Sequence, residues 1–477
     1  MATIINQQPL YNTFPVGQDV IFTVSNANLV SSELQVKFIA DVYITSEEQP
    51  VMVGPSDKRG TFKTTPNNAG VGMFDFRAII ESYVKADNLA AEGSAYKETA
   101  TTQDSTHPLH LIDNYSTSNN IIRYFSVKFS VQYLGAGSDP NVVTTAAGSF
   151  ETSDVYKIFN GYLKYNDVLR LDGVDFGYNM SAFNLNGSDK KFLTNASTTQ
   201  YANVNDYGTI GIWMYNKPYI DPNNLTGFRH LMFRYYASSG AQLDFEAMTL
   251  TPSNGGFEYA NSSLIKNNII YAGIYPGNLQ GWSTKFQTLV AAGTISHYTV
   301  RAEYTTAVLN VPLSQTYTIN VKCPSLYNYE PIRLGWLNQW GAWDYYTFTQ
   351  KSIRTISTKG STYNQLEGSW NESAYRLNSY KGGKKAFRVN ATEKIKMNTD
   401  FVTEAEGEWF EDLMNSPEVY ILKGYQDLDE TEYALNQYVT PVRITSKSFT
   451  RKTIANDRLM QYTFEIEKSK ILRTQSI

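Results

Sequence analysis

Strict alternation of apolar and polar residues marks several stretches of the chain as β-strands that face a core on one side. The clearest stretch is 34–44, where one face carries Leu34, Val36, Phe38, Ala40, Val42 and Ile44. Residues 123–133 repeat the pattern with Phe125, Val127, Phe129, Val131 and Tyr133. A short apolar run over 20–24 precedes both. These strands predict an N-terminal β-sandwich-like domain, residues 20–135, preceded by an irregular arm at residues 1–19.

The segments between these strands are more polar. Residues 55–72 are rich in Pro, Gly, Asn and Thr and are predicted to be a loop. A short helix is expected next, capped by Asp75 and carrying Phe76, Ile79, Ile80 and Tyr83 at helical spacing. Residues 86–120 show no periodicity, which is typical of a functional or disordered segment. Residues 135–150 are expected to be a loop at a domain edge.

The middle of the chain contains many short apolar runs separated by Gly, Asn and Asp. Strands are predicted at 162–168, 208–214, 230–236, 243–250, 269–274 and 299–308, with a hairpin over 311–321. Asn-rich segments at 184–205 and 216–224 are expected to be exposed loops. Strands at this spacing predict a central β-sandwich or barrel domain, residues 136–325.

The last part of the chain, residues 326–477, combines strands with one well-marked helix. Thr403 and Glu406 form a capping-box pattern ahead of an apolar stripe of Trp409, Phe410, Leu413 and Met414. Strands are predicted at 353–357, 385–389, 393–397, 419–422, 439–445 and 459–466. We therefore expect a mainly β, multidomain protein whose C-terminal domain is α+β.

An aromatic hairpin opens this C-terminal domain. Residues 332–337 and 343–348 are predicted strands, joined by a tight turn over 338–341 that contains Gly341. The hairpin carries the candidate interaction residues Trp336, Trp340, Trp343, Tyr345 and Tyr346. One interpretation is that these rings form a domain core; the other is that they form a surface for sugars or a partner subunit.

The same hairpin carries a resemblance to a known class of proteins. The segment W-L-N-Q-W-G-A-W-D-Y-Y-T-F, residues 336–348, resembles virion structural proteins of tailed bacteriophages, especially phages of Bacteroidota-type hosts. Residues 408–422 and 441–449 are similar to the segments that come after the aromatic one in those proteins, and residues 66–76 also look similar. The resemblance covers roughly residues 325–470 and does not extend to residues 140–320. It implies a structural part of the virion, of distal-tail or tail-hub type by analogy.

Composition and charge narrow the possible functions. Charged residues make up 18% of the 477 residues, below the roughly 25% of typical soluble domains, and there are 35 tyrosines. This composition suits β-structure and polar-aromatic contact surfaces in assemblies. The net charge of −4, without a basic tail, argues against nucleic-acid binding. A signal peptide and a membrane-spanning helix are not expected, because neither pattern occurs.

Candidate chemistry is sparse. Cys323 is the single cysteine, so neither a disulfide framework nor a multi-cysteine metal site is expected, and its thiol is expected to be buried. His107 and His110 have a spacing that permits a shared metal, although two loop histidines are the favoured interpretation. The carboxylate pairs Asp172 with Asp175 and Glu411 with Asp412 do not form a convincing glycosidase pair, and the first lacks the full pattern of a calcium loop. Lys384 and Lys385 are expected at a solvated hairpin tip. We expect no enzyme activity and no cofactor.

Taken with the resemblance, these observations predict a structural component of a tailed-phage virion, assembled in the host cytoplasm and placed in the tail tip or baseplate. Its expected partners are copies of itself, in a ring or another multimer, and other tail proteins; nucleic acid and membrane are not expected partners. The arm at 1–19 and the stretch at 86–120 are predicted to reach neighbouring subunits. The alternative is a carbohydrate- or receptor-binding module that stacks exposed aromatic rings on a host glycan. Exposure of Trp340 would support the alternative, and full burial would oppose it.

Overall fold

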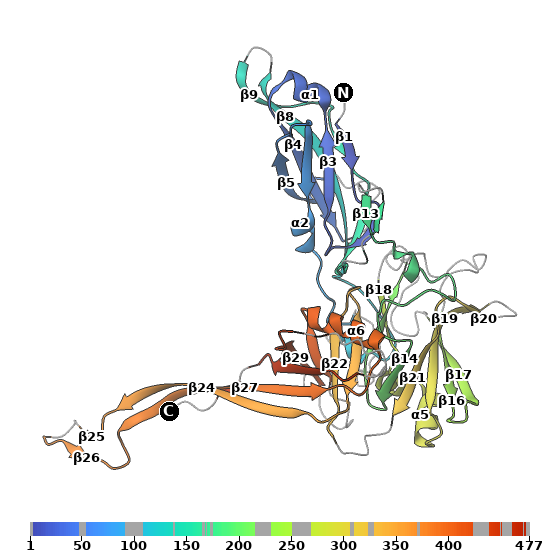
Figure 1. Ribbon diagram of the computed structural model, residues 1–477, viewed down its shortest axis with the longest axis vertical. Helices are drawn as coiled ribbons and strands as arrows, with labels where there is room; N and C mark the ends of the chain where they lie inside the picture. The colour runs from blue at the N-terminus through green and yellow to red at the C-terminus, as the bar shows by residue number, and fades with distance from the viewer. Residues whose placement is uncertain are drawn as a thin grey trace. The chain divides into compact units, whose positions relative to one another are not determined.

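The computed structural model describes residues 3–46, 54–90, 108–136, 139–164, 167, 169–171, 175–214, 230–249, 269–305, 310–322, 329–369, 373–422, 438–448, 450, 460–470 and 472–473. Within these residues the fold is mainly β and contains several separate sheets, as the sequence predicted (Figure 1). The chain forms two compact units. Unit 1 comprises Met1–Val321 with Asn338–Asp344, and unit 2 comprises Lys322–Leu337 with Tyr345–Ile477.

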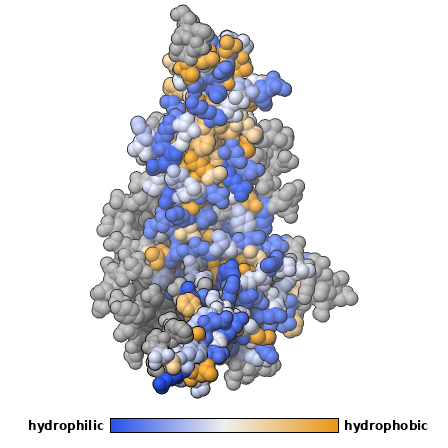
Figure 2. All heavy atoms as spheres, turned by 90° about the vertical axis from the view of Figure 1, so that its left-hand side faces the viewer, coloured by the Kyte–Doolittle hydropathy of each residue, from blue (hydrophilic) through white to orange (hydrophobic). Residues whose placement is uncertain are grey.

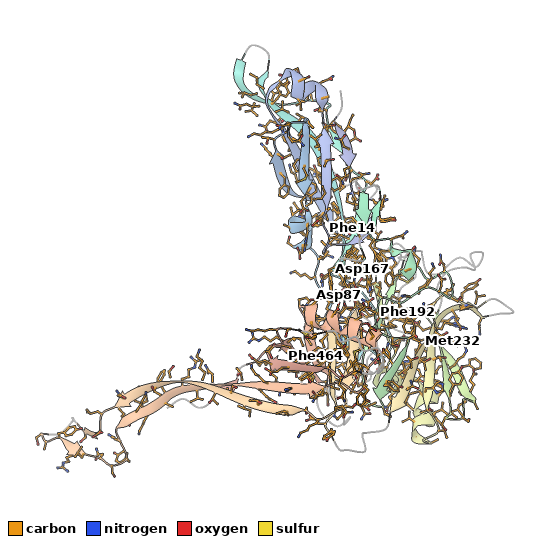
Figure 3. All side chains as sticks on the ribbon, viewed as in Figure 1. Phe14, Asp87, Asp167, Phe192, Met232 and Phe464 are labelled. Carbon is orange, nitrogen blue, oxygen red and sulfur yellow. The ribbon has the colours of Figure 1, made fainter. Side chains whose placement is uncertain are left out.

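The N-terminal part of unit 1 is sandwich-like, as predicted. One sheet has the order β1 (Ile4–Gln7), β3 (Ile21–Ser25), β6 (Val71–Asp75). The other has the order β2 (Thr13–Pro15), β11 (Tyr156–Phe159), β8 (Ile122–Ala136), β4 (Leu34–Thr45), β5 (Lys58–Thr64), with β9 (Asp139–Thr145) and β10 (Glu151–Thr152) paired to β8. Rings from both sheets fill the space between them, among them Phe14 (labelled in Figure 3), Phe22 and Phe125. Burying the predicted apolar faces of β4 and β8 is what builds this core.

The structure corrects several expectations for this part. Residues 3–16 are not an irregular arm, because β1 pairs with β3, β2 pairs in parallel with β11, and Phe14 is 1% exposed. The expected loop at 55–72 contains β5, whose mostly exposed residues pair with β4. The expected loop at 135–150 contains β9. The face predicted for β4 holds except at Leu34, which is 68% exposed because a register shift interrupts the pairing beside Gln35.

Two short helices belong to this region. Helix α1 (Ala27–Ser32) was not predicted, and α2 (Arg77–Glu81) is the helix that the sequence predicted. The carboxylate of Asp75 accepts a hydrogen bond from the Arg77 amide at 3.0 Å, near the start of α2. Only one turn and a half forms, with Phe76 and Ile80 buried and Tyr83 half-buried against the same core.

The rest of unit 1 contains two further sheets. The six-stranded sheet has the order β14 (Thr199–Asn203), β21 (Tyr317–Lys322), β19 (His297–Thr305), β16 (His230–Tyr236), β17 (Gln242–Thr249), with β20 (Asn310–Pro312) paired to β19. The three-stranded sheet is β15 (Thr209–Trp213), β18 (Ile269–Gly273), β7 (Tyr115–Thr117). This region also contains a pair of short strands, β12 (Leu169–Leu171) and β13 (Asp175–Gly177), and the 3₁₀ helices η2 (Leu109–Leu111) and η4 (Met180–Phe183). Most central strands therefore lie where the pattern predicted them.

The central region also departs from the predictions. No strand occurs at residues 162–164, and residues 165, 166 and 168 lie outside the described residues. Helices α4 (Pro276–Trp282) and α5 (Thr284–Ala291) were not predicted. The loop expected at 184–205 contains β14, and the loop expected at 216–224 lies outside the described residues. The polar stretch 86–120 is partly undescribed, but 108–118 is largely buried and contributes η2 and β7, so this portion is not an arm that reaches a neighbour.

Unit 2 is built on one eight-stranded sheet and one helix. The sheet order is β23 (Trp343–Phe348), β22 (Ile332–Leu337), β28 (Val419–Leu422), β29 (Val439–Ile444), β30 (Thr463–Lys468), β27 (Gly383–Asn398), β24 (Ile353–Gln365), with β31 (Leu472–Arg473) paired to β27. Helix α6 (Glu404–Asn415) has the predicted capping box at Thr403 and buries Trp409, Phe410 and Leu413. Phe464 (labelled in Figure 3) packs 5.3 Å from the Phe410 ring. This mixed composition agrees with the predicted α and β elements.

A long two-stranded ribbon extends from this sheet. Strands β24 and β27 pair from Ile353 with Lys396 to Gln365 with Gly383, and β30 accompanies β27 only from Lys394 onward. Beyond that point the two strands continue alone for most of their length, apart from the short contact with β31, and short strands β25 (Gly368–Ser369) and β26 (Arg376–Leu377) lie at the far end (Figure 1). The sequence predicted only three short strands here, at 353–357, 385–389 and 393–397, the last two of which are parts of the single strand β27.

Candidate functional site

The five candidate interaction residues of the aromatic hairpin are mostly buried. Trp336 is 0%, Trp343 1%, Trp340 3% and Tyr345 3% exposed, and Tyr346 is half-buried. The strands and turn of the hairpin lie where the sequence predicted them. The rings therefore belong to cores, which opposes sugar stacking on the surface of the hairpin.

The turn of the hairpin is a packing element of unit 1. Trp340 packs with centroid distances of 4.7 Å to Phe183 and 5.0 Å to Tyr178, and its indole N–H donates to Asn195 Oδ1 at 2.9 Å. The Trp343 indole N–H donates to the carbonyl oxygen of Asp87 at 3.0 Å. Both indoles thus have a hydrogen-bond partner inside the unit, as buried tryptophans usually do.

Polar side chains fix the shape of this turn. The Asn338 side-chain oxygen accepts hydrogen bonds from the Trp340 and Ala342 amides, each at 3.0 Å. Its amide nitrogen donates to Asp344 Oδ1 at 3.0 Å, and Thr194 Oγ1 donates to the same carboxylate oxygen at 2.6 Å. Buried polar groups need such partners, so these bonds specify one conformation of the turn.

The strands of the hairpin pack under helix α6 in unit 2. The Trp336 ring lies 5.0 Å from Trp409, and Tyr346 lies edge-on to Phe410 at 5.0 Å. Burial raises the pKa of the Tyr346 phenol above its usual range, and its oxygen accepts from the Asp400 amide at 3.2 Å. The Tyr346 side chain thus belongs to the cluster of rings that anchors the helix.

The residues considered for catalysis and metal binding do not come together as a site. His110 lies in the 3₁₀ helix η2, is 1% exposed, and has its ring centroid 4.6 Å from that of Trp343. His107, Asp172 and Cys323 lie outside the described residues. Asp412 is fully buried in α6, next to the half-buried Glu411. Over the described part of the chain, no three His, Cys, Asp or Glu side chains are placed to hold a metal ion.

Three buried or half-buried carboxylates were missed by the sequence analysis. Glu303 is 0% exposed and pairs with Arg234 at 2.8 Å and with Arg301. Glu246 accepts hydrogen bonds from the Tyr235 hydroxyl and Ser283 Oγ. Burial raises the pKa of Asp87 (labelled in Figure 3), while amide hydrogen bonds from Asn120 and Asn119 oppose that rise. These carboxylates tie together elements of unit 1.

The ribbon of β24 and β27 is the exposed feature that needs a functional explanation. Ile356, Phe387, Leu377 and Tyr380 are 66%, 61%, 74% and 74% exposed. Side chains stand out on both sides along the ribbon in Figure 3, and the face drawn in Figure 2 carries scattered hydrophobic residues (orange) among hydrophilic ones (blue). An isolated two-stranded hairpin is only marginally stable in water, and unpaired edges with exposed apolar residues favour association.

The ribbon also corrects the expectation for two lysines. Lys384 and Lys385 do not lie at a hairpin tip, because they pair with Asn364 and Tyr363 inside the ribbon. The segment that closes the hairpin lies between Gln365 and Gly383. The sequence did not predict a ribbon because the residues of its strands lack a one-sided apolar face. The signal that was available is that Lys and Arg residues lie close to Tyr and Phe residues in this part of the chain.

Comparisons with known proteins give no family for the chain. No family model matches it, and no curated protein matches it. Among solved structures, the chain is similar to the native conformation of alpha-2-macroglobulin from E. coli, with 10% sequence identity and a TM-score of 0.17. That alignment covers 83% of this chain and 22% of the other, so the chain spans about a fifth of that protein's length. A likeness this low carries no argument about fold or function.

No helix in the described ranges is long and apolar enough to cross a membrane.

Proposed function

We propose that this protein is a structural component of a tailed-phage virion that assembles as multiple copies in the tail tip or baseplate and contacts other tail proteins. The observation that carries the proposal is the exposed ribbon, since a projecting two-stranded arm with large apolar side chains gains stability when another protein surface covers it. The resemblance of residues 336–348, 408–422 and 441–449 to virion proteins supplies the class of assembly.

The packing of the hairpin supports a structural role over a sugar-binding one. The tryptophans that a glycan would stack on are buried, and each of Trp340 and Trp343 uses its indole N–H within unit 1. A sugar-binding protein needs aromatic rings whose faces are exposed, whereas a subunit of an assembly needs a rigid scaffold from which an arm projects.

Electron microscopy and light scattering of the purified protein test the self-assembly part. We expect rings or another defined multimer of the 53.8 kDa chain. A single species at the monomer mass at all concentrations would contradict self-assembly. Mass spectrometry of purified particles of a phage that encodes this chain tests the virion part independently, and absence of the protein from those particles would contradict it.

Shortening the ribbon tests whether it is the arm that drives assembly. Residues Thr358 and Ala391 face each other in the pairing, so replacing 359–390 with Asn-Gly closes the hairpin with a favoured two-residue turn. We expect this variant to keep its far-UV circular dichroism per residue and its melting temperature within a few degrees, and to lose multimer formation. Retention of the multimer would show that the ribbon is not needed.

A further inference from the structure

The ribbon has one face that combines positive charge with aromatic rings. Directly opposite residues of an antiparallel pair project to the same side, and Ser361 faces Arg388 while Tyr363 faces Lys385. Lys359, two residues before Ser361, shares that side. The Phe387 ring meets Tyr363 edge-on at 6.5 Å, which places it there too. We define the ribbon face as Lys359, Tyr363, Lys385, Phe387 and Arg388.

The charge of the ribbon is opposite to that of the remaining chain. Residues 358–391 contain six basic and two acidic residues, a net charge of +4. Because the whole chain has a net charge of −4, the remainder carries −8. Lys359 and Arg388 are exposed and form no ion pair within the part of the chain that the structure describes. This positive surface therefore complements the rest of an identical chain.

A concentration of negative charge accompanies helix α6. Residues 401–422 contain six acidic residues and no basic one. Glu404, Glu408 and Glu411 follow at i, i+4 and i+7 and so share one side of the helix, opposite the buried Trp409. We define the acidic face as Glu404, Glu408 and Glu411, with Phe401, which is 62% exposed, beside its start.

The ribbon face cannot reach the acidic face of its own chain while the sheet is intact. Helix α6 packs on the sheet with Trp409 against Trp336 of β22 and with Phe410 against Phe464 of β30, and β30 accompanies β27 only as far as Lys394. Lys385 lies nine residues beyond Lys394, where the pairing with β30 stops, which places it roughly 30 Å along an extended strand from that point. The complementary surface must therefore belong to another molecule.

We propose that the ribbon face of one copy docks on the acidic face of α6 in a second copy. Opposite charges steer and orient the contact, and Tyr363, Phe387 and Phe401 supply apolar area that is otherwise exposed to water. The inference rests on the proposed function, because it names the contact through which copies assemble. Donor and acceptor surfaces differ, so the contact is heterologous and repeats into a ring or a filament.

Charge reversal in trans tests this contact. One variant carries Lys385→Glu with Arg388→Glu, and a second carries Glu404→Lys with Glu408→Lys. Each alone should raise the concentration at which multimers form at least tenfold in light scattering, because like charges then meet at the contact. An equimolar mixture of the two should assemble again, since both of its possible contacts pair opposite charges. The single chain with all four changes should also assemble.

Controls separate misfolding from lost contact. Lys37→Glu with Lys191→Glu changes the same charge at two exposed positions of unit 1 and should leave assembly unaltered. Circular dichroism and melting temperature should match across all variants. Restored assembly in the mixture also shows directly that both variants are folded.

The results distinguish this inference from the proposed function. If the wild-type protein forms multimers and neither reversal weakens them, the contact is wrong and assembly through another surface stands. If the single reversals prevent assembly but the mixture does not restore it, the pairing of these two faces is wrong. If the wild-type protein stays monomeric, self-docking is overturned, while its presence in phage particles is still decided by mass spectrometry.

Discussion

Gly341, in the turn of the aromatic hairpin, offers the sharpest test of whether the hairpin is a core element. Its φ of +75° lies in the left-handed region, which costs an L-residue about 1–2 kcal/mol. A Cβ at this position would also overlap the carbonyl oxygen of Asn160 and lie 2.8 Å from the Ile121 side chain. Relieving such overpacking typically costs about 1–3 kcal/mol. Gly341→Ala should therefore lower the free energy of unfolding by about 2–5 kcal/mol.

Gly240 supplies a matched control within the same unit. Its φ is +83°, and an added Cβ would have no atom within 4 Å. Gly240→Ala should thus cost only the conformational term of about 1–2 kcal/mol. Urea unfolding followed by tryptophan fluorescence and far-UV circular dichroism measures both variants. Equal losses of stability would refute the tight packing of the turn and, with it, the assignment of Trp340 to a core.

Further predictions concern other parts of the fold. Trp340→Ala should lower the free energy of unfolding by about 3–5 kcal/mol in urea titrations; an unchanged melting temperature would speak against the core assignment. Thr403→Ala should cost about 1 kcal/mol, because it removes the capping box of α6, and an equally stable variant would show that the cap is dispensable. Burial raises the pKa of Asp87 in the folded state. Above about pH 4 the folded protein therefore keeps a proton on Asp87 that the unfolded chain releases. The contribution of Asp87 to the free energy of unfolding should consequently fall as the pH rises from about 4 through the folded-state pKa. Asp87→Asn should remove that fall, so its stability relative to wild type should be higher at pH 8 than at pH 4; a constant difference would contradict the shift.

The sequence predicted elements well where one face of a strand is buried. Strands β4 and β8 bury apolar residues at period two, and that period is visible in the residue types alone. Both strands of the aromatic hairpin are buried at nearly every residue and were predicted from their aromatic content and the glycine-bearing turn between them. Helix α6 was equally visible, because its capping box and apolar stripe are local features. In these elements, local pattern and tertiary packing point to the same structure.

Elements without a one-sided apolar face were missed. Strand β5 exposes most of its residues and is held by its pairing with β4. Helix α4 depends on a distant contact, since the fully buried Asn278 donates to the Ile112 carbonyl at 2.6 Å and accepts from the Gly208 amide at 2.9 Å. Such long-range hydrogen bonds have no signature in the residues of the helix itself.

The candidate site shows the same limit. Aromatic type and spacing identified a hairpin with large rings, but residue type does not say which side of a pleated strand meets protein and which meets water. Trp340 and Trp343 are buried because distant residues, Asn195 and Asp87, lie against them. The ribbon illustrates the reverse case, since its Tyr and Phe are as apolar as those of the core and remain exposed.

The basic residues of the ribbon admit a second explanation, which the charge-reversal design separates from the first. Lysines on exposed edges protect strands against unwanted pairing, whatever surface the ribbon contacts. Glutamate is also charged, so Lys385→Glu and Arg388→Glu keep that protection while they invert the sign that a partner meets. If the basic residues serve only to keep the edge soluble, the ribbon variant and the α6 variant should each assemble like the wild type. Their mixture should then assemble no better than either variant alone. If each variant alone loses assembly and the mixture regains it, then assembly depends on the sign of the charge on each surface. Edge protection does not depend on that sign, whereas complementarity between two surfaces does.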